Sequence, residues 1–187
     1  MSSLLVSILS SPLTWIMGVY GLFMGSFYNV CIFRIPEGSF LSKTRSICRH
    51  CQEKIPFYHN IPLLSFVLLR GRAACCQQKI SWIYPVVELS TALLFITIYW
   101  HFPFIEAYGD RWSIDPLNLI RFLHALIFSS VLLICSVIDL RLMIIPDVLS
   151  IPMILLSPLV AFIHPELKLL DALIGAALGG GVLYAIA

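Results

Sequence analysis

The chain has 187 residues, of which 59% are hydrophobic and only 12% are charged, whereas a soluble domain carries about 25% charged residues. The mean hydropathy is +0.93, and the apolar residues come in runs long enough to cross a bilayer, roughly 20 residues each. This composition excludes an ordinary soluble protein. It predicts an all-α polytopic membrane protein. The expected partner is the lipid bilayer, and no nucleic acid is expected to bind.

The basic residues are distributed unevenly along the chain. Eight of the twelve lie between Arg34 and Lys79, a segment whose only acids are Glu37 and Glu53. Lysine and arginine are retained on the cytoplasmic side of membrane proteins, so this segment is predicted to be cytoplasmic and the N-terminus to lie outside. Residues 1–33 carry no charged side chain, which excludes the basic start of an ordinary signal peptide. The first apolar run is therefore predicted to remain as a membrane helix.

About five membrane helices are expected. They cover residues 11–33, 84–100, 117–138, 144–163 and 168–187. In the first of them Gly18, Gly21 and Gly25 recur about once per turn, and small residues on one face allow another helix to approach closely. Residues 101–116 are expected to form a short loop on the outer side.

Residues 34–84 are predicted to form a small cytoplasmic domain that contains cysteines. Cys48 and Cys51 form a C-x-x-C pair, and the adjacent Cys75 and Cys76 follow it. Four thiolates suit the tetrahedral coordination of zinc, and a domain too small for a large core gains stability from a metal. The spacing therefore predicts a structural zinc ion held by these four cysteines.

The second cysteine pair is irregular, and this leaves alternatives open. Ala73 stands three positions before Cys76, where a regular C-x-x-C pair would have its first ligand. Cys75 is the first choice for the fourth ligand, and His50 and His59 are the alternatives. Reduced thiols that hold no metal are the other interpretation, since cytoplasmic cysteines stay reduced.

Acidic residues at the ends of apolar runs are the candidate catalytic groups. Asp139 lies between two long apolar runs, and ionisable residues at such positions are functional by default. Asp147 follows eight residues later, and two carboxylates that share a site can divide the roles of acid and base. Alternatively, Asp147 caps the next helix. Glu88, near the start of the second run, either faces a polar cavity or is a helix-start acid.

Several blocks of sequence together resemble the type IV prepilin peptidases, bifunctional leader peptidases and N-methyltransferases of the bacterial inner membrane. The blocks lie at residues 25–36, 45–51, 60–65, 69–72 with Cys76, 80–88, 138–140 with 145–147, and 150–152. The resemblance implies a multi-pass aspartic peptidase with a periplasmic N-terminus. Its substrates would be the prepilins of type IV pili and the pseudopilins of type II secretion, and it would methylate the new N-terminal residue with S-adenosylmethionine.

The resemblance assigns cleavage to two aspartates at the cytoplasmic membrane face. The first matches Asp139. The second belongs to a Gly-x-Gly-Asp motif on a later helix, and neither Asp147 nor Asp171 lies in such a motif. The chain is therefore expected to be the first two thirds of an enzyme, with residues 85–187 as an incomplete membrane peptidase domain and Asp147 as a secondary candidate.

Two other hypotheses follow from the missing motif. The chain could be a catalytically inactive relative that acts as a membrane assembly or scaffold protein. It could also be half of a transporter with Asp139 on an ion pathway, although the small number of charges inside the apolar runs argues against transport.

Overall fold

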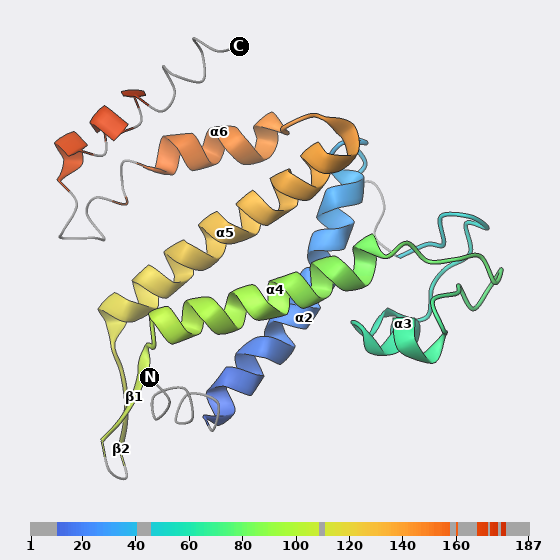
Figure 1. The fold of residues 1–187 in the computed structure, drawn as a ribbon, viewed down its shortest axis with the longest axis horizontal. Coiled ribbons are helices and arrows are strands. Elements are labelled where there is room, and N and C mark those ends of the chain that lie inside the picture. The colour runs from blue at the N-terminus through green and yellow to red at the C-terminus, as the bar shows by residue number, and fades with distance from the viewer. Residues whose placement is uncertain are drawn as a thin grey trace. The chain divides into compact units, whose positions relative to one another are not determined.

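The computed structural model describes residues 11–40, 46–108, 111–157, 160, 168–171, 173–175, 177 and 178. Helices predominate in this part of the chain (Figure 1). The elements are α2 (Pro12–Arg34), the 3-10 helix η1 (Phe57–Asn60), α3 (Leu64–Leu68), α4 (Ile83–His101), β1 (Ile105–Tyr108), β2 (Arg111–Ile114), α5 (Pro116–Leu142) and α6 (Asp147–Leu156). The chain divides into two compact units, Met1–His101 with Leu132–Ile145 and Phe102–Val131 with Pro146–Ala187.

Three of the described helices, α2, α4 and α5, are long and apolar enough to cross a membrane. They correspond to the first three predicted spans within a few residues at each end. The fourth predicted span, residues 144–163, is described only in part, because α6 covers ten of its residues and residues 158, 159 and 161–163 lie outside the described residues. The fifth, residues 168–187, lies largely outside the described residues, so the count of five stays a prediction.

Helices α2 and α4 pack closely through the glycine face of α2. A Cβ atom added at Gly21 would lie 2.7 Å from the Cα atom of Ala92, and one added at Gly25 would lie 2.6 Å from the Cα atom of Glu88. No residue larger than glycine fits at these distances without a shift of the backbone. Because the later glycine faces the earlier residue of α4, the two helices run antiparallel. The close helix contact that the glycine spacing predicts is therefore present.

Hydrogen bonds hold the same register at both ends of this helix pair. The side chain of Asn29 donates from Nδ2 to the carbonyl oxygen of Tyr84 over 3.1 Å, and Trp100 donates from Nε1 to Thr14 Oγ1 over 3.4 Å. Large apolar side chains are exposed elsewhere on α2, among them Trp15, Val19 and Phe23. An apolar surface of this kind suits contact with lipid rather than with water.

Substitution of Gly21 by alanine should weaken the α2–α4 contact. The new methyl group would meet the backbone of Ala92, which cannot rotate away, and overpacking of this kind costs about 1–3 kcal/mol. The melting temperature of the purified protein in detergent should therefore fall. Gly175→Ala is the control, because a Cβ atom there meets nothing within 4 Å. Equal melting temperatures for the wild type and Gly21→Ala would contradict the observed packing.

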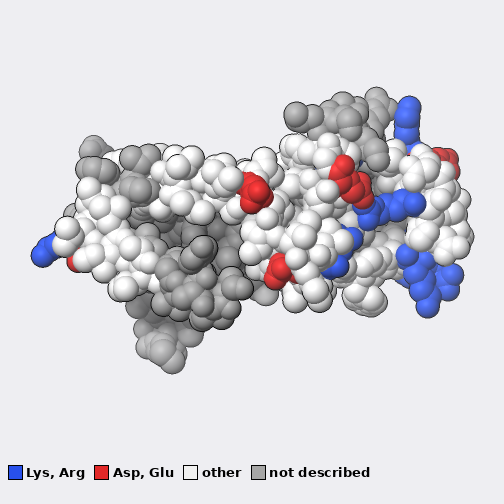
Figure 2. Space-filling model, turned by 90° about the horizontal axis from the view of Figure 1, so that it is seen from above, with Lys and Arg blue, Asp and Glu red and all other residues white. Residues whose placement is uncertain are grey.

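The segment between α2 and α4 contains little regular structure. Within residues 46–82 the structure has η1, the five-residue helix α3 and two isolated β-bridges, Ile47–Lys54 and Arg72–Lys79. Most of the lysine and arginine side chains visible in Figure 2 gather at the end of the first unit where α3 lies. The basic character predicted for this segment is therefore also visible on its surface.

The second unit contains an element that the sequence analysis missed. Residues 101–116 were expected to form a loop, and this is wrong, because β1 and β2 pair antiparallel there with Ile105 opposite Ile114. Helix α5 follows directly, and Asp115 Oδ1 accepts the backbone N–H of Leu117 over 2.9 Å. This bond caps the start of the helix.

Candidate functional site

The four cysteines of the polar segment lie in two hairpins of the same construction. The first is closed by the bridge Ile47–Lys54 and the second by the bridge Arg72–Lys79. At the sixth position of each hairpin the backbone has a positive φ, 60° at Gln52 and 57° at Gln77. Residues other than glycine rarely adopt a positive φ. Its occurrence at the same position in both hairpins therefore indicates that the two turns are equivalent.

The hydrogen bonds extend this equivalence to the cysteines. In each hairpin the second residue, Cys48 or Ala73, donates its N–H to the carbonyl oxygen five residues further on over 2.8 Å. Ala73 therefore occupies the place of Cys48, and Cys76 that of Cys51. Cys75 has no cysteine counterpart in the first hairpin. The structure thus explains the irregular spacing as a regular turn that lacks its first cysteine.

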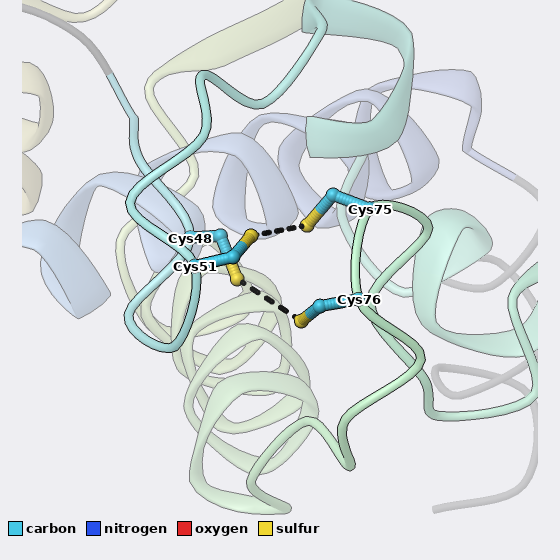
Figure 3. Close-up of side chains that lie close together, drawn as sticks. All are labelled: Cys48, Cys51, Cys75 and Cys76. Atoms are coloured by element: carbon cyan, nitrogen blue, oxygen red, sulfur yellow. Dashed lines mark hydrogen bonds between the residues drawn. The ribbon is translucent and has the colours of Figure 1, made fainter.

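The two hairpins bring the four thiols together (Figure 3). Cys48 Sγ lies 3.7 Å from Cys76 Sγ, Cys51 Sγ lies 3.1 Å from Cys75 Sγ, and all four atoms lie within 4.8 Å of one another. In a tetrahedral zinc site with Zn–S bonds of about 2.3 Å, the sulfur atoms are about 3.8 Å apart. The cluster could therefore hold a metal ion. Neither His50 nor His59 belongs to this cluster. The assignment of the four cysteines as ligands stays a prediction.

The hairpin backbone already favours a thiolate at Cys48. The backbone N–H of Cys51 is the main cause, and together with that of His50 it lowers the pKa of the Cys48 thiol to about 6. Cys75 differs, because its hydrogen bond with the Cys51 side chain raises its pKa to about 12. A metal requires deprotonated ligands, so binding near neutral pH displaces a proton from Cys75 but hardly from Cys48. Metal retention should therefore decrease as the pH falls.

Asp139 lies near the C-terminal end of α5 with its side chain exposed. Two residues later, the Arg141 guanidinium carbon lies 4.1 Å from the centre of the Phe33 ring, and the same atom of Arg49 lies 4.0 Å from it. Such contacts between a cation and an aromatic ring are attractive. Because Arg49 lies between Cys48 and Cys51, the Phe33 ring joins the cysteine hairpin to the end of α5 that carries Asp139.

Asp147 is the first residue of α6, and its side chain is also exposed. The N-cap residue is Pro146, and no side chain caps this helix, so the interpretation of Asp147 as a cap is wrong. Its charge lies instead in the first turn, where the helix dipole favours an acid. Asp139 belongs to the first compact unit and Asp147 to the second. The hypothesis that they form a catalytic pair stays a prediction.

Two buried polar groups, Asn29 and Glu88, lie in the apolar helices α2 and α4. Glu88 lies more than one turn after the start of α4, and its Oε2 accepts the N–H of Leu63 over 2.8 Å; the helix-start interpretation of Glu88 is therefore wrong. Sequence reasoning did not single out Asn29, which is 2% exposed and whose Oδ1 has no hydrogen-bond partner among the described residues. A polar residue inside an apolar span was the signal that could have identified it.

Comparisons with known proteins place this arrangement in a family. Residues 19–102 match the bacterial peptidase A24 N-terminal domain, and residues 126–187 match the type IV leader peptidase family. The chain belongs to the type IV leader peptidase family. The resemblance found in the sequence is thereby confirmed. With its three long apolar helices, this membership points to an integral protein of the bacterial inner membrane.

Curated relatives in this family carry the name prepilin leader peptidase/N-methyltransferase. The relative from Klebsiella pneumoniae is 36% identical over 165 residues, covering 85% of this chain and 66% of its own length. The relative from Myxococcus xanthus (strain DK1622) is 37% identical, covering 86% and 44%, and that from Neisseria gonorrhoeae is 32% identical, covering 96% and 65%. The chain therefore spans about two thirds or less of these relatives. No solved structure matches it.

Proposed function

We propose that this protein cleaves the leader peptide of type IV prepilins and pseudopilins and then methylates the new N-terminal residue. The observation that carries the proposal is the presence in one chain of matches to both parts of the family, at residues 19–102 and 126–187. Relatives that bear both activities in their name support it. Three apolar helices fit a substrate that is itself held in the membrane.

Asp139 is proposed as one of the two carboxylates that carry out cleavage. Hydrolysis of a peptide bond needs one group that removes a proton from the attacking water and one that gives a proton to the leaving amine. Two carboxylates whose pKa values differ can perform both steps without a nucleophilic side chain. The exposure of Asp139 at the end of α5 supports this role, because the site must be open to both water and substrate.

Zinc is proposed as the metal of the cysteine cluster, with Cys48, Cys51, Cys75 and Cys76 as ligands. The support is the set of distances between the four sulfur atoms and the thiolate already favoured at Cys48. Four thiolates leave no open position on a tetrahedral ion, so the zinc would be structural rather than catalytic.

The proposed orientation places residues 34–84 and Asp139 at the cytoplasmic face and the N-terminus in the periplasm. The excess of lysine and arginine in residues 34–84 supports this orientation. The contact between Arg141 and Phe33 is consistent with it, because it brings the ends of α2 and α5 to the same side of the first unit.

Complementation tests the proposal directly. The natural gene would be expressed in a bacterium whose own prepilin peptidase gene is deleted, and pilin from its membranes would be analysed by mass spectrometry. Loss of the leader reports cleavage, and a mature chain that is heavier by one methylene reports methylation. Pilin that keeps its leader despite normal expression of the protein in the membrane would contradict the proposal and favour a non-catalytic assembly role.

A further inference from the structure

A cavity of about 880 Å³ lies within the first unit, and the proposed cleavage step does not use it. Apart from Arg141, the residues that line it fall between positions 26 and 88, inside the part that matches the A24 N-terminal domain. Asp139 is not among them. The volume is within the usual range for cavities that bind small molecules, about 300–1,000 Å³.

Two buried hydrogen-bond acceptors line this cavity from facing helices. At Gly25, helix α2 packs against Glu88 of α4. Asn29 lies one turn after Gly25 on α2. Asn29 Nδ2 is bonded to the carbonyl oxygen of Tyr84, which leaves Oδ1 buried without a partner among the residues described. Buried polar groups nearly always have a partner. The arrangement therefore indicates a ligand that brings an N–H or O–H donor to Asn29 Oδ1.

The lining of the cavity also includes cations, which lie near Phe33. Arg49 and Arg141 both line the cavity and lie against the Phe33 ring, at 4.0 and 4.1 Å. Arg49 is paired with Glu37 over 2.9 Å, whereas Arg141 forms no ion pair within the described part of the chain. Its guanidinium is thus held in place with donors that suit a carboxylate. The lining of the cavity therefore offers both hydrogen-bond acceptors and a cation.

On the basis of the proposed function, we propose that Asn29 Oδ1 and the Glu88 carboxylate bind the α-amino group that is methylated, the one that leader cleavage exposes on the pilin. A primary amine provides the N–H donor that Asn29 Oδ1 lacks, and its positive charge suits the Glu88 carboxylate, whose Oε2 already accepts the N–H of Leu63. The methionine part of S-adenosylmethionine also carries an α-amino group, together with a carboxylate that suits Arg141. The shared chemistry is an aliphatic amine, and the experiment distinguishes its two sources.

The chemistry requires an acceptor of this kind. An α-ammonium group has a pKa of about 7.7–8.0 and is mostly protonated at neutral pH, and it must lose one proton before its nitrogen can attack. Glu88 accepts that proton, and Asn29 Oδ1 accepts a remaining N–H and so orients the nitrogen lone pair that forms the new C–N bond. S-adenosylmethionine supplies the methyl group, and its sulfur keeps the electron pair of the broken C–S bond.

Glu88→Gln is the deciding variant, because glutamine keeps an oxygen for the N–H of Leu63 but cannot take up a proton. In the full-length protein, purified in detergent and given prepilin and S-adenosylmethionine, methylation should fall about a hundredfold while leader cleavage stays within about twofold. Equilibrium dialysis with radiolabelled S-adenosylmethionine should give an unchanged Kd. Asn29→Ala should show the same separation of the two activities. Asp171→Asn, at an exposed carboxylate that does not line the cavity, should retain both.

Three results would overturn the inference. Methylation at the wild-type rate in Glu88→Gln would exclude the amine-binding role. A tenfold or larger loss of S-adenosylmethionine affinity would assign the two acceptors to the cofactor rather than to the pilin. Equal loss of cleavage and methylation in Glu88→Gln would show that Glu88 has only a structural role, through its hydrogen bond to Leu63. A wild-type protein that neither cleaves nor methylates would instead contradict the proposed function itself.

Discussion

Replacement of Asp139 by asparagine should reduce prepilin cleavage by about 10²–10⁴-fold, the usual contribution of a positioned acid or base. Asparagine has nearly the same shape as aspartate but cannot take up or release a proton. Because the Asp139 side chain is exposed at the end of α5, the substitution removes no buried contact and should leave the fold unchanged. The measurement is the rate of leader removal from prepilin by the full-length protein in membranes.

Two controls separate catalysis from damage to the protein. Asp147→Asn changes an exposed carboxylate in the first turn of α6 and should have a much smaller effect. A mature pilin peptide with a free N-terminus should still be methylated by Asp139→Asn, because this residue does not line the cavity. Full cleavage by Asp139→Asn would remove the catalytic assignment. A loss as large in Asp147→Asn would make Asp147 the second acid.

The contact between α2 and α4 could be predicted from the sequence, because it depends on a local pattern. Gly18, Gly21 and Gly25 recur at the spacing of a helix turn, and this repeat specifies a face of small residues. Which helix covers that face could not be predicted, since it depends on residues far along the chain. The structure supplies Ala92 and Glu88 as the facing positions.

The hairpin at β1 and β2 was missed although its signal is present in the sequence. Short runs in which apolar and polar residues alternate flank the dipeptide Gly109-Asp110. A glycine-containing dipeptide between two such runs is typical of a β-hairpin. The apolar runs on both sides of this segment favour a short connection between two membrane helices. Here a local pattern was outweighed by the composition of the whole chain.

The environment of Glu88 was beyond prediction for a different reason. Its bond reaches the backbone of Leu63, 25 positions away, and Leu63 has a φ of 55° that a leucine rarely adopts. No spacing rule connects an acid in an apolar helix with a strained residue in a preceding loop. The cavity that these residues line depends on the same long-range arrangement, so sequence reasoning could name Glu88 but not its role.

The second large effect is expected at the cysteine cluster, where the purified protein should contain one zinc ion per chain. Cys48→Ser or Cys51→Ser should abolish zinc retention, as measured by metal analysis of the protein in detergent. Because residues 46–82 have little regular structure and structural zinc contributes directly to folding, loss of the metal should also expose this segment to protease. Cys135→Ser, in α5 and outside the cluster, should retain the zinc and the resistance.

The equivalence of the two hairpins allows a sharper test of the fourth ligand. Cys75→Ser should lose zinc, because Ala73 provides no sulfur at the place that Cys48 occupies in the first hairpin. Adding Ala73→Cys to Cys75→Ser should restore zinc binding. Residue 73 has the same backbone hydrogen bond in the second hairpin as the ligand Cys48 has in the first, so the new thiol would occupy the equivalent ligand position. If Cys75→Ser alone keeps its zinc, Cys75 is not a ligand and the site is completed by another group. If the double variant stays free of zinc, the two turns are not equivalent as metal sites, whatever their backbones share.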